Sequence, residues 1–337
     1  MELTPRKEKI LAEVVREFLE SGEPVGSKAI AEKVGVSSAT IRNEMADLID
    51  LGLLQQPHTS AGRVPTQQGY REYVNRMEVP VLTDQEKRAL VTELLSSGYE
   101  PERILQRISQ LLAQVSHCAA VVSAPNGSAA KIKAVQFVQT SRRTAMLLMM
   151  SSAGTLKSRV FRCDFDLTGD MMRIFFRLFN EKVAGVNVSD ITPAFLQSAA
   201  VSFGDMYALA ASPLTALLET AQDTGHTDYY VSGQMNLLFF PQLPHRQVLD
   251  LLENRNDLAD LLEGRPGKVV ARIGSENGRS ALREASVLVG RYRVGFQDAG
   301  SLALIGPMHM EYPRMTAILQ FLTDEAGELL TALLQEE

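Results

Sequence analysis

The sequence predicts an α+β protein that begins with a winged helix-turn-helix. Two short amphipathic segments separated by a glycine, at 27–34 and 38–50, precede a hairpin pattern at 53–66. Beyond residue 117, short apolar or alternating runs with glycine turns between them indicate antiparallel strands. A helical stretch over 165–224 interrupts these strands before they resume. We therefore expect one α+β domain that carries an inserted, mainly helical unit.

The overall composition is that of a soluble globular protein. The chain has 337 residues, 45% of them hydrophobic and 22% charged, which predicts two or three domains with a sizeable core. Its net charge of −6 argues against a protein that coats polyanions. Two cysteines, Cys118 and Cys163, are too few for a disulfide framework. With no apolar run of about 18 residues and no signal peptide pattern, we expect a cytoplasmic protein.

The two short segments carry the residues that begin and end helices. Ser27 is expected to cap the first helix, and Gly35 can adopt the left-handed conformation that ends it. Ser37 is expected to cap the second helix, which Gly52 closes. This spacing is typical of a helix-turn-helix.

The phase of the second helix indicates its role. Ile41, Met45 and Leu48 recur at helical spacing and form one inward stripe. Small and hydrogen-bonding side chains then occupy the outer face of the first turn, as a helix entering the major groove of DNA requires. Arg42 could reach a guanine edge or a phosphate, and Asn43 could pair with adenine. An ordinary amphipathic surface helix is the alternative, and the hairpin that follows favours DNA binding.

The hairpin reads as a wing. Its turn runs from Pro57 to Gly62, and Arg63 follows a small, flexible tip, so its side chain could lie along the phosphates or in the minor groove. Residues 1–80 hold 10 Lys and Arg against 12 Asp and Glu, a net of −2, which is unusual for a nucleic-acid-binding domain. Any positive charge must therefore be concentrated on one face. The residues expected to contact DNA are Ser27, Lys28, Ser38, Ala39, Thr40, Arg42, Asn43, Thr59, Ser60, Gly62 and Arg63.

Two further helices frame this domain. The first begins at Thr4-Pro5, an N-cap followed by proline, and continues to about Leu19, where it completes a three-helix core. Another helix leaves the wing, and its Tyr70 and Tyr73 could touch the DNA backbone or pack into that core, with packing favoured. Val79-Pro80-Val81 is the expected linker.

The remaining elements follow from periodicity. We expect helices at 84–95, 101–115, 245–262 and 313–334. We expect strands at 119–123, 132–138, 145–150, 156–161, 228–232, 269–273, 286–294 and 301–305.

An apolar stripe marks the helical stretch in the middle of the chain. It consists of Met171, Met172, Phe175, Phe176 and Phe179. Methionine and phenylalanine are enriched where protein surfaces meet, so this stripe could form a dimer interface. It could equally fill the core of the inserted unit, and the sequence favours neither.

The sequence gives little support for catalysis. The five histidines, His58, His117, His226, His245 and His309, are scattered without metal-ligand spacing. Signatures of zinc proteases, α/β-hydrolases and dinucleotide-binding folds are missing. Glu276-Asn277 could bind something, although a turn after a strand explains these residues more simply. We expect no enzyme, no cofactor and no metal.

At this point the sequence resembles a known family, the heat-inducible transcription repressor HrcA family. The resemblance covers essentially the whole chain, and the segment Pro57-His-Thr-Ser-Ala-Gly-Arg-Val-Pro-Thr is its most specific motif. Further matching stretches are Pro24-Val-Gly-Ser-Lys, Val36-Ser-Ser-Ala-Thr-Ile-Arg-Asn-Glu-Met, Gly233-Gln-Met-Asn-Leu-Leu, Ile273-Gly-Ser-Glu-Asn and Gly306-Pro-Met-His-Met-Glu-Tyr. The last departs from the family's arginine-containing version, which leaves the role of that loop open.

The resemblance implies an organisation and a function. It implies a winged-helix DNA-binding domain at 1–78, a discontinuous GAF-like α+β domain at 79–164 and 226–337, and an inserted dimerisation domain at 165–225. It also implies a homodimer that binds double-stranded DNA at an inverted-repeat operator (CIRCE) ahead of chaperone genes, with release on heat stress and a GroEL-type chaperonin as partner. The alternative is a winged-helix regulator controlled by a small molecule in the GAF-like domain.

Overall fold

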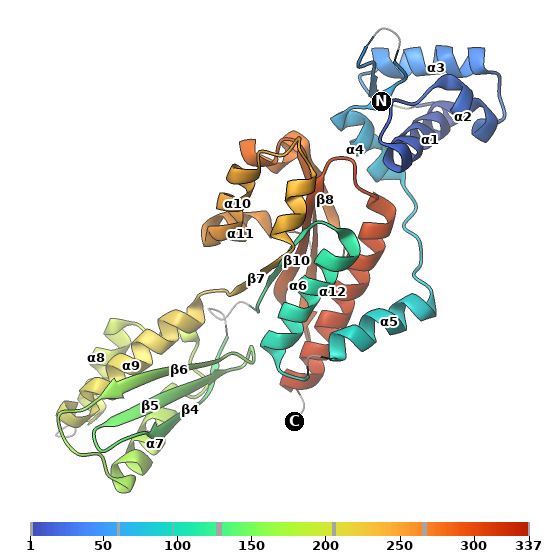
Figure 1. Cartoon of the computed structure of the whole chain (residues 1–337). Helices are drawn as coiled ribbons and strands as arrows, with labels where there is room; N and C mark the ends of the chain where they lie inside the picture. The colour runs from blue at the N-terminus through green and yellow to red at the C-terminus, as the bar shows by residue number, and fades with distance from the viewer. Residues whose placement is uncertain are drawn as a thin grey trace.

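The computed structural model describes residues 3–58, 61–96, 98–125, 130–203, 207–264 and 268–335. Three bodies lie in a row (Figure 1). A small helical body with a two-stranded hairpin, which we call the reader, lies at the N-terminal end. A five-stranded sheet with helices on both faces forms the centre, and a unit with its own three-stranded sheet lies at the other end.

The reader has the expected winged helix-turn-helix architecture. It consists of α1 (Pro5–Ser21), α2 (Ser27–Val34), α3 (Ser38–Asp50), β1 (Leu54–Gln55), β2 (Val64–Pro65) and α4 (Gln67–Arg76). The hydroxyl of Thr4 accepts a hydrogen bond from the Lys7 N–H, so α1 begins where the sequence predicted. Ile10, Leu11 and Val14 of α1 are buried together with the inward stripe of α3. The three-helix core is confirmed.

The choice left open for the two tyrosines of α4 is resolved by burial. Tyr70 and Tyr73 both lie in the hydrophobic core, so they pack and do not face DNA. After α4 the chain is extended from Met77 to Thr83, and the Val81 side chain is 85% exposed. The predicted linker is confirmed.

The central body is an α+β domain. Its five antiparallel strands lie in the order β7 (Tyr229–Ser232), β3 (Ala119–Ser123), β10 (Gln297–Pro307), β9 (Ala285–Val294) and β8 (Val270–Ile273). Alternating side chains of β3, β7, β9 and β10 enter two separate cores because successive residues point to opposite faces. The remaining elements are α5 (Asp84–Leu95), α6 (Pro101–Ser116), η3 (Gln234–Phe239), α10 (His245–Glu253), α11 (Arg255–Leu261), η4 (Gly274–Asn277), η5 (Ser280–Leu282) and α12 (Tyr312–Gln335).

These helices cover the sheet on both faces (Figure 1). Val122 and Leu302 share a core with α6 and α12, whereas their neighbours Val121 and Ala303 share the other core with α10 and α11. The helix predicted over 245–262 is interrupted at Asn254. Its side chain accepts hydrogen bonds from the first backbone N–H groups of α11 and so starts a new helix there.

The third unit corrects one expectation. The strands predicted at 132–161 do not join the central sheet but form a separate one in the order β4 (Ile132–Gln139), β5 (Thr144–Ser151), β6 (Leu156–Arg162). Phe137, Leu147 and Phe161 on one face of this sheet share a core with the helices that follow in the chain. Those elements are α7 (Gly169–Val183), η1 (Val188–Asp190), α8 (Pro193–Phe203) and α9 (Tyr207–Gly225). The strand period identified each strand but not the sheet to which it belongs.

The chain enters and leaves this unit at one point on the central sheet. Ser123 of β3 pairs with Tyr229 of β7, and the Ala124 N–H donates to the Asp228 carbonyl at 2.8 Å. The described residues between these two positions lie outside the central sheet. We therefore propose that the inserted unit spans 125–228, in place of the 165–225 expected from the sequence.

The apolar stripe of α7 is divided between core and surface. Phe175 and Phe179 are each 1% exposed and pack against Phe137, so these two residues fill the core of the inserted unit and cannot form an interface. Phe176 on the same helix is 44% exposed. Met171 and Met172 are partly buried against the same core. As a whole, therefore, the stripe is not an open surface.

Candidate nucleic-acid interface

Helix α3 presents the face that the sequence predicted. Its inward stripe is buried, and the Ser37 hydroxyl accepts a hydrogen bond from the Thr40 N–H at 3.1 Å, which fixes the start of the helix. Ala39, Arg42 and Asn43 are exposed on the opposite side. Figure 1 shows α3 at the outer end of the molecule, on the side away from the central body. The first turn of α3 is therefore open to a large partner.

The start of α2 lies against the start of α3, although not in the predicted way. Gly26 is the N-cap of α2, and Ser27 is its first helical residue. The Ser27 hydroxyl is 2.9 Å from the Ser38 hydroxyl and shares a hydrogen bond with it. Ser27 therefore joins two helix N-termini instead of capping one. Lys28, next to it, is exposed.

The wing is joined to the same region by backbone pairing. The Arg63 N–H donates to the Val25 carbonyl at 2.8 Å, and the Val25 N–H donates back to the Arg63 carbonyl at 2.9 Å. This bridge holds the wing beside the chain segment that enters α2. The N-termini of α2 and α3 and the base of the wing are thus one connected surface, which we call the reading face. Thr59 and Ser60, predicted to belong to it, lie outside the described residues.

Gly62 has a packing role at this junction. A Cβ atom at Gly62 would lie 2.5 Å from the carbonyl oxygens of both Pro24 and Val25, closer than a real Cβ contact allows. We expect Gly62→Ala to push the wing away from α2 and to cost about 1–3 kcal/mol, as overpacking usually does. Hydrogen exchange of reader amides in the full-length protein should then be faster at Val25 and Arg63.

Gly26 supplies the matched control for that variant. It lies two residues before Lys28, has φ −87°, and a Cβ there would meet nothing within 4 Å. Gly26→Ala can only weaken the N-cap of α2, so it should raise exchange at Val25 and Arg63 less than Gly62→Ala does. Equal effects of the two variants would show that the close approach at Gly62 does not hold the wing.

Ion pairing concentrates positive charge on the reading face. Within the described part of the reader, the cations that lie within 4 Å of a carboxylate are Arg6, Lys7, Arg16, Lys33, Arg71 and Arg76. Among the same described residues, Lys9, Lys28, Arg42 and Arg63 have no such partner. Lys9 lies on α1, and the other three lie on α2, α3 or the wing. Although residues 1–80 have a net charge of −2, the reading face therefore carries cations that are free to bind phosphates.

Arg63 is held close to the wing in this structure. Its Nη1 donates to the Ala61 and Gly62 carbonyls at 3.2 and 3.4 Å, and its buried Nε has no hydrogen-bond partner. A buried N–H without a partner destabilises the folded protein. A phosphate oxygen that accepts a hydrogen bond from the Arg63 Nε would remove that penalty. The side chain is thus only weakly held in place.

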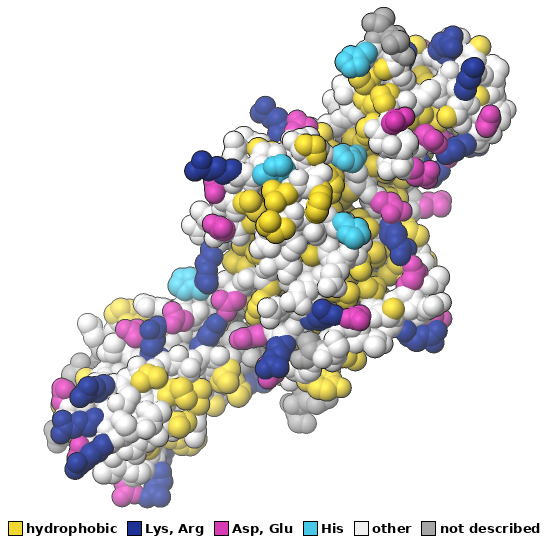
Figure 2. Space-filling view, in the orientation of Figure 1, with side chains coloured by type: hydrophobic (Ala, Val, Ile, Leu, Met, Phe, Trp, Pro, Cys, Tyr) yellow, Lys and Arg dark blue, Asp and Glu magenta, His cyan; other side chains and the backbone are white. Residues whose placement is uncertain are grey.

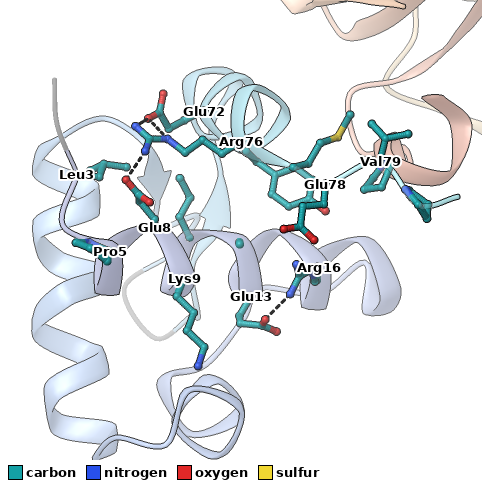
Figure 3. Close-up of a pocket in the computed structure, with 16 residues that line it drawn as sticks. Leu3, Pro5, Glu8, Lys9, Glu13, Arg16, Glu72, Arg76, Glu78 and Val79 are labelled. Atoms are coloured by element: carbon teal, nitrogen blue, oxygen red, sulfur yellow. Dashed lines mark hydrogen bonds and ion pairs between the residues drawn. The ribbon is translucent and has the colours of Figure 1, made fainter. Parts of the chain in front are cut away.

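A groove of about 710 Å³ lies between α1, α4 and the linker (Figure 3). The Arg76 guanidinium points between Glu8 and Glu72 and donates to both. Pro313 of α12 also lines the groove, which therefore lies where the reader meets the central body. Both of its arginines are already paired, Arg16 with Glu13 and Arg76 with Glu8 and Glu72, unlike the cations of the reading face.

Sequence reasoning missed the contacts that orient the reader. Gln67 and Arg71 of α4 bind the turn after β8, more than 200 residues away in the chain. The stretch Ile273-Gly-Ser-Glu-Asn was the one sign of these contacts in the sequence. The sequence does not show that it binds Gln67 and Arg71. Among the described residues there is no group of three or more His, Cys, Asp or Glu that could hold a metal ion. In the described part of the chain, no helix is long and apolar enough to cross a membrane.

Comparisons with known proteins agree along the whole chain. The family "Winged helix-turn-helix transcription repressor, HrcA DNA-binding" matches residues 2–78, and "HrcA protein C terminal domain" matches residues 102–316. The chain is 30% identical to the "Heat-inducible transcription repressor HrcA" of Thermoanaerobacter sp. (strain X514), with both chains fully covered. It is 32% identical to that of Clostridium tetani (strain Massachusetts / E88), over 98% of this chain and 96% of the relative. A solved structure described as a hypothetical protein at 2.2 Å resolution matches with a TM-score of 0.66 and 25% identity, over 98% of this chain and all of the other.

Proposed function

Because the chain belongs to the heat-inducible transcription repressor HrcA family, we propose that it binds the inverted-repeat operator (CIRCE) of chaperone and chaperonin genes as a homodimer, and that heat releases it. A GroEL-type chaperonin would modulate the active fraction. The protein would act in the cytoplasm, where operator and chaperonin meet, and would have no catalytic role. The observation that carries the proposal is the reading face.

Each part of the reading face suits one kind of DNA contact. Arg42 and Asn43 project from the first half of α3, where a bidentate guanidinium or amide can read a guanine or an adenine in the major groove. Ala39 lets the backbone approach, and Ser38 and Thr40 can donate to phosphates or base edges. Ser27 and Lys28 would contact the backbone beside α2, and Gly62 and Arg63 would place the wing, together with Thr59 and Ser60.

The inserted unit offers a surface for the second copy. Its helices cover only one face of the β4–β5–β6 sheet, and the outward side chains of the other face, which we call the open sheet face, are mainly apolar. Cross-strand rows on it are Val138–Met146–Val160, Gln136–Leu148–Ser158 and Ala134–Met150–Leu156. Figure 2 shows hydrophobic side chains gathered over this end of the molecule. An apolar patch of this kind is typical of an interface between subunits.

Dimerisation would supply the selectivity that one reader lacks. A single winged helix covers few base pairs, too few to select one genomic site. A two-fold dimer reads an inverted repeat, and the second contact adds affinity because it is already tethered near its half-site. The moderate positive charge of the reading face is therefore sufficient if two copies bind together.

The central body exposes apolar side chains that suit a chaperonin. Met235, Leu238 and Phe239 lie on η3, and the Phe239 side chain is 81% exposed. Exposed apolar clusters are what chaperonins bind, and folding stability of a few kcal/mol would let heat change the active fraction. The family resemblance and this exposed apolar cluster both support a chaperonin as the partner. Adding chaperonin to a partly inactive preparation should raise the fraction that binds operator, and excess unfolded protein should abolish that gain.

The first experiment is operator binding by fluorescence anisotropy over a salt series. Wild-type protein should prefer a duplex with the inverted repeat over a scrambled one, and moving the half-sites apart by half a turn should abolish that preference. Equal binding to both duplexes, with chaperonin present, would overturn the proposal. A regulator controlled by a small molecule would then be the next candidate.

Arg63→Ala tests the wing directly. Loss of one phosphate contact should weaken operator binding about tenfold and lower the salt slope by about 1, while sedimentation still shows a dimer. Lys33→Ala is the control, because the Lys33 ammonium is already bound by Glu17 at 2.6 Å and should contribute little to DNA binding. Unchanged affinity of Arg63→Ala would remove the wing from the interface.

A further inference from the structure

The reader is fixed to the central body by a short turn after β8. The Gln67 amide of α4 donates to the Ser275 hydroxyl at 2.8 Å and accepts from the Ser275 N–H at 3.0 Å. One turn further along α4, the Arg71 Nε donates to Glu276 at 2.8 Å, and its Nη2 donates to the same carboxylate and to the Ala271 carbonyl. We call Gln67, Arg71, Ser275 and Glu276 the reader latch.

The body side of the latch is rigid. The Glu276 carboxylate also accepts from the Ile273 N–H at 2.9 Å, and the Asn277 amide donates to the Gly274 carbonyl at 2.9 Å. Burial alone would raise the pKa of Glu276, but the bonds from Arg71 and the Ile273 N–H outweigh it and hold that pKa below its ordinary value. The acceptor that meets Arg71 is therefore charged and preoriented.

Gly274 allows the close approach. It adopts φ +57°, and a Cβ there would lie 2.5 Å from the Gln67 Oε1. A side chain at this position would displace the Gln67 amide from Ser275 and strain the backbone. Glycine at position 274 thus allows the Gln67 amide to approach the turn closely. A nonspecific surface contact would not need such a close approach.

The other attachments of the reader are less directional. The linker from Met77 to Thr83 is extended. The Phe18 ring of α1 meets His309 edge-on at 6.5 Å, and Tyr70 meets Tyr312 at 6.1 Å. Ring contacts of this kind tolerate tilting, whereas a bidentate arginine–carboxylate pair fixes an angle. The latch is therefore the contact that sets the orientation of the reader.

We propose that Gln67 and Arg71, bound to Ser275 and Glu276, set the angle of each reader on its body and thereby the half-site spacing that the dimer accepts. They are positioning residues and make no DNA contact themselves, because the Arg71 guanidinium is already bound by Glu276. This inference rests on the proposed binding of an inverted repeat by a dimer. It gives the stretch Ile273-Gly-Ser-Glu-Asn a role in operator selection.

The physical reason concerns the second contact. When both readers are held at one angle, the second recognition helix meets its half-site without reorganisation, and only one spacing fits. If the latch is broken, the reader can tilt on its linker. Affinity for the duplex with the preferred spacing then falls because the second reader is no longer aligned with its half-site. Affinity for duplexes with neighbouring spacings falls less.

The experiment uses full-length protein and a series of duplexes whose half-sites are identical but whose spacing changes in steps of one base pair. Glu276→Gln keeps the shape of the side chain and its bond from Ile273, and Arg71→Met keeps the length of the arginine stem. A duplex with a single half-site measures the reader alone. Arg279→Ala is the matched control, because Arg279 pairs with Asp257 inside the body at side-chain exposures of 29% and 30%, against 29% and 31% for Arg71 and Glu276.

We expect Glu276→Gln and Arg71→Met each to weaken binding at the preferred spacing about tenfold and to flatten the spacing profile, with single half-site affinity unchanged. The double variant should add little to either, since both remove the same contact. Arg279→Ala should keep the wild-type profile. A wild-type profile in both latch variants would overturn the inference alone. A wild-type protein without any spacing preference would overturn the proposed function and the inference with it.

Discussion

Leu148→Asp should prevent the proposed homodimer from forming and weaken operator binding by at least about a hundredfold. Leu148 lies at the centre of the open sheet face, on the middle strand β5, between Gln136 of β4 and Ser158 of β6. A carboxylate at the centre of a subunit interface would be buried without a partner. Such a group costs about 3–5 kcal/mol, which corresponds to a factor of roughly 100–4000 in the dimer dissociation constant.

The fold of the monomer should tolerate that change. The Leu148 side chain points away from the core that Leu147 and Met149 form with the helices, so its replacement removes no packing inside the unit. Sedimentation would report the monomer, and circular dichroism would show that the fold is kept. The variant should still bind a single half-site as well as the wild type does.

Phe176→Asp is the control that separates two possible interfaces. Phe176 is the exposed aromatic residue of the α7 stripe, which the sequence left as one possible dimer interface. We expect this variant to remain a dimer with wild-type operator affinity. If Phe176→Asp were monomeric and Leu148→Asp remained a dimer, the interface would lie on α7 and not on the open sheet face.

The elements that the sequence predicted well are those set by local rules. The stripe of Ile41, Met45 and Leu48 follows from helical periodicity, and the Ser37 cap follows from one hydroxyl and one N–H. Both depend only on neighbours in the chain. The exposed side of α3, with Arg42 and Asn43, then follows by exclusion.

The elements that the sequence could not predict depend on distant partners. Alternation identified β4, β5 and β6, but the sheet they join depends on which core buries their inner face. Likewise, Gln67 and Ser275 are separated by 208 positions, and neither residue type predicts that the other is its hydrogen-bond partner. Local signals predict elements and caps, whereas the pairing of surfaces requires the three-dimensional arrangement.

Phe175→Ala should remove about 3–5 kcal/mol from the free energy of unfolding of the inserted unit, the usual cost of truncating a buried phenylalanine. Its ring is 5.8 Å from that of Phe137 and 6.2 Å from that of Phe179, so the variant leaves a cavity where strand β4 meets α7. Phe176→Ala, the same change one position along the helix, should cost less than about 0.5 kcal/mol because Phe176 is partly in solvent.

Hydrogen exchange of the β5 amides measures this difference in the intact chain, where separate units need not unfold together. Protection at Leu147 and Met149 should fall in Phe175→Ala and stay near the wild-type level in Phe176→Ala. Equal losses would contradict the division of the α7 stripe into core and surface. If the open sheet face forms the dimer, Phe175→Ala must also lower the temperature at which the protein leaves its operator, since an unfolded sheet offers no interface. A core residue far from DNA would then set the temperature of the switch.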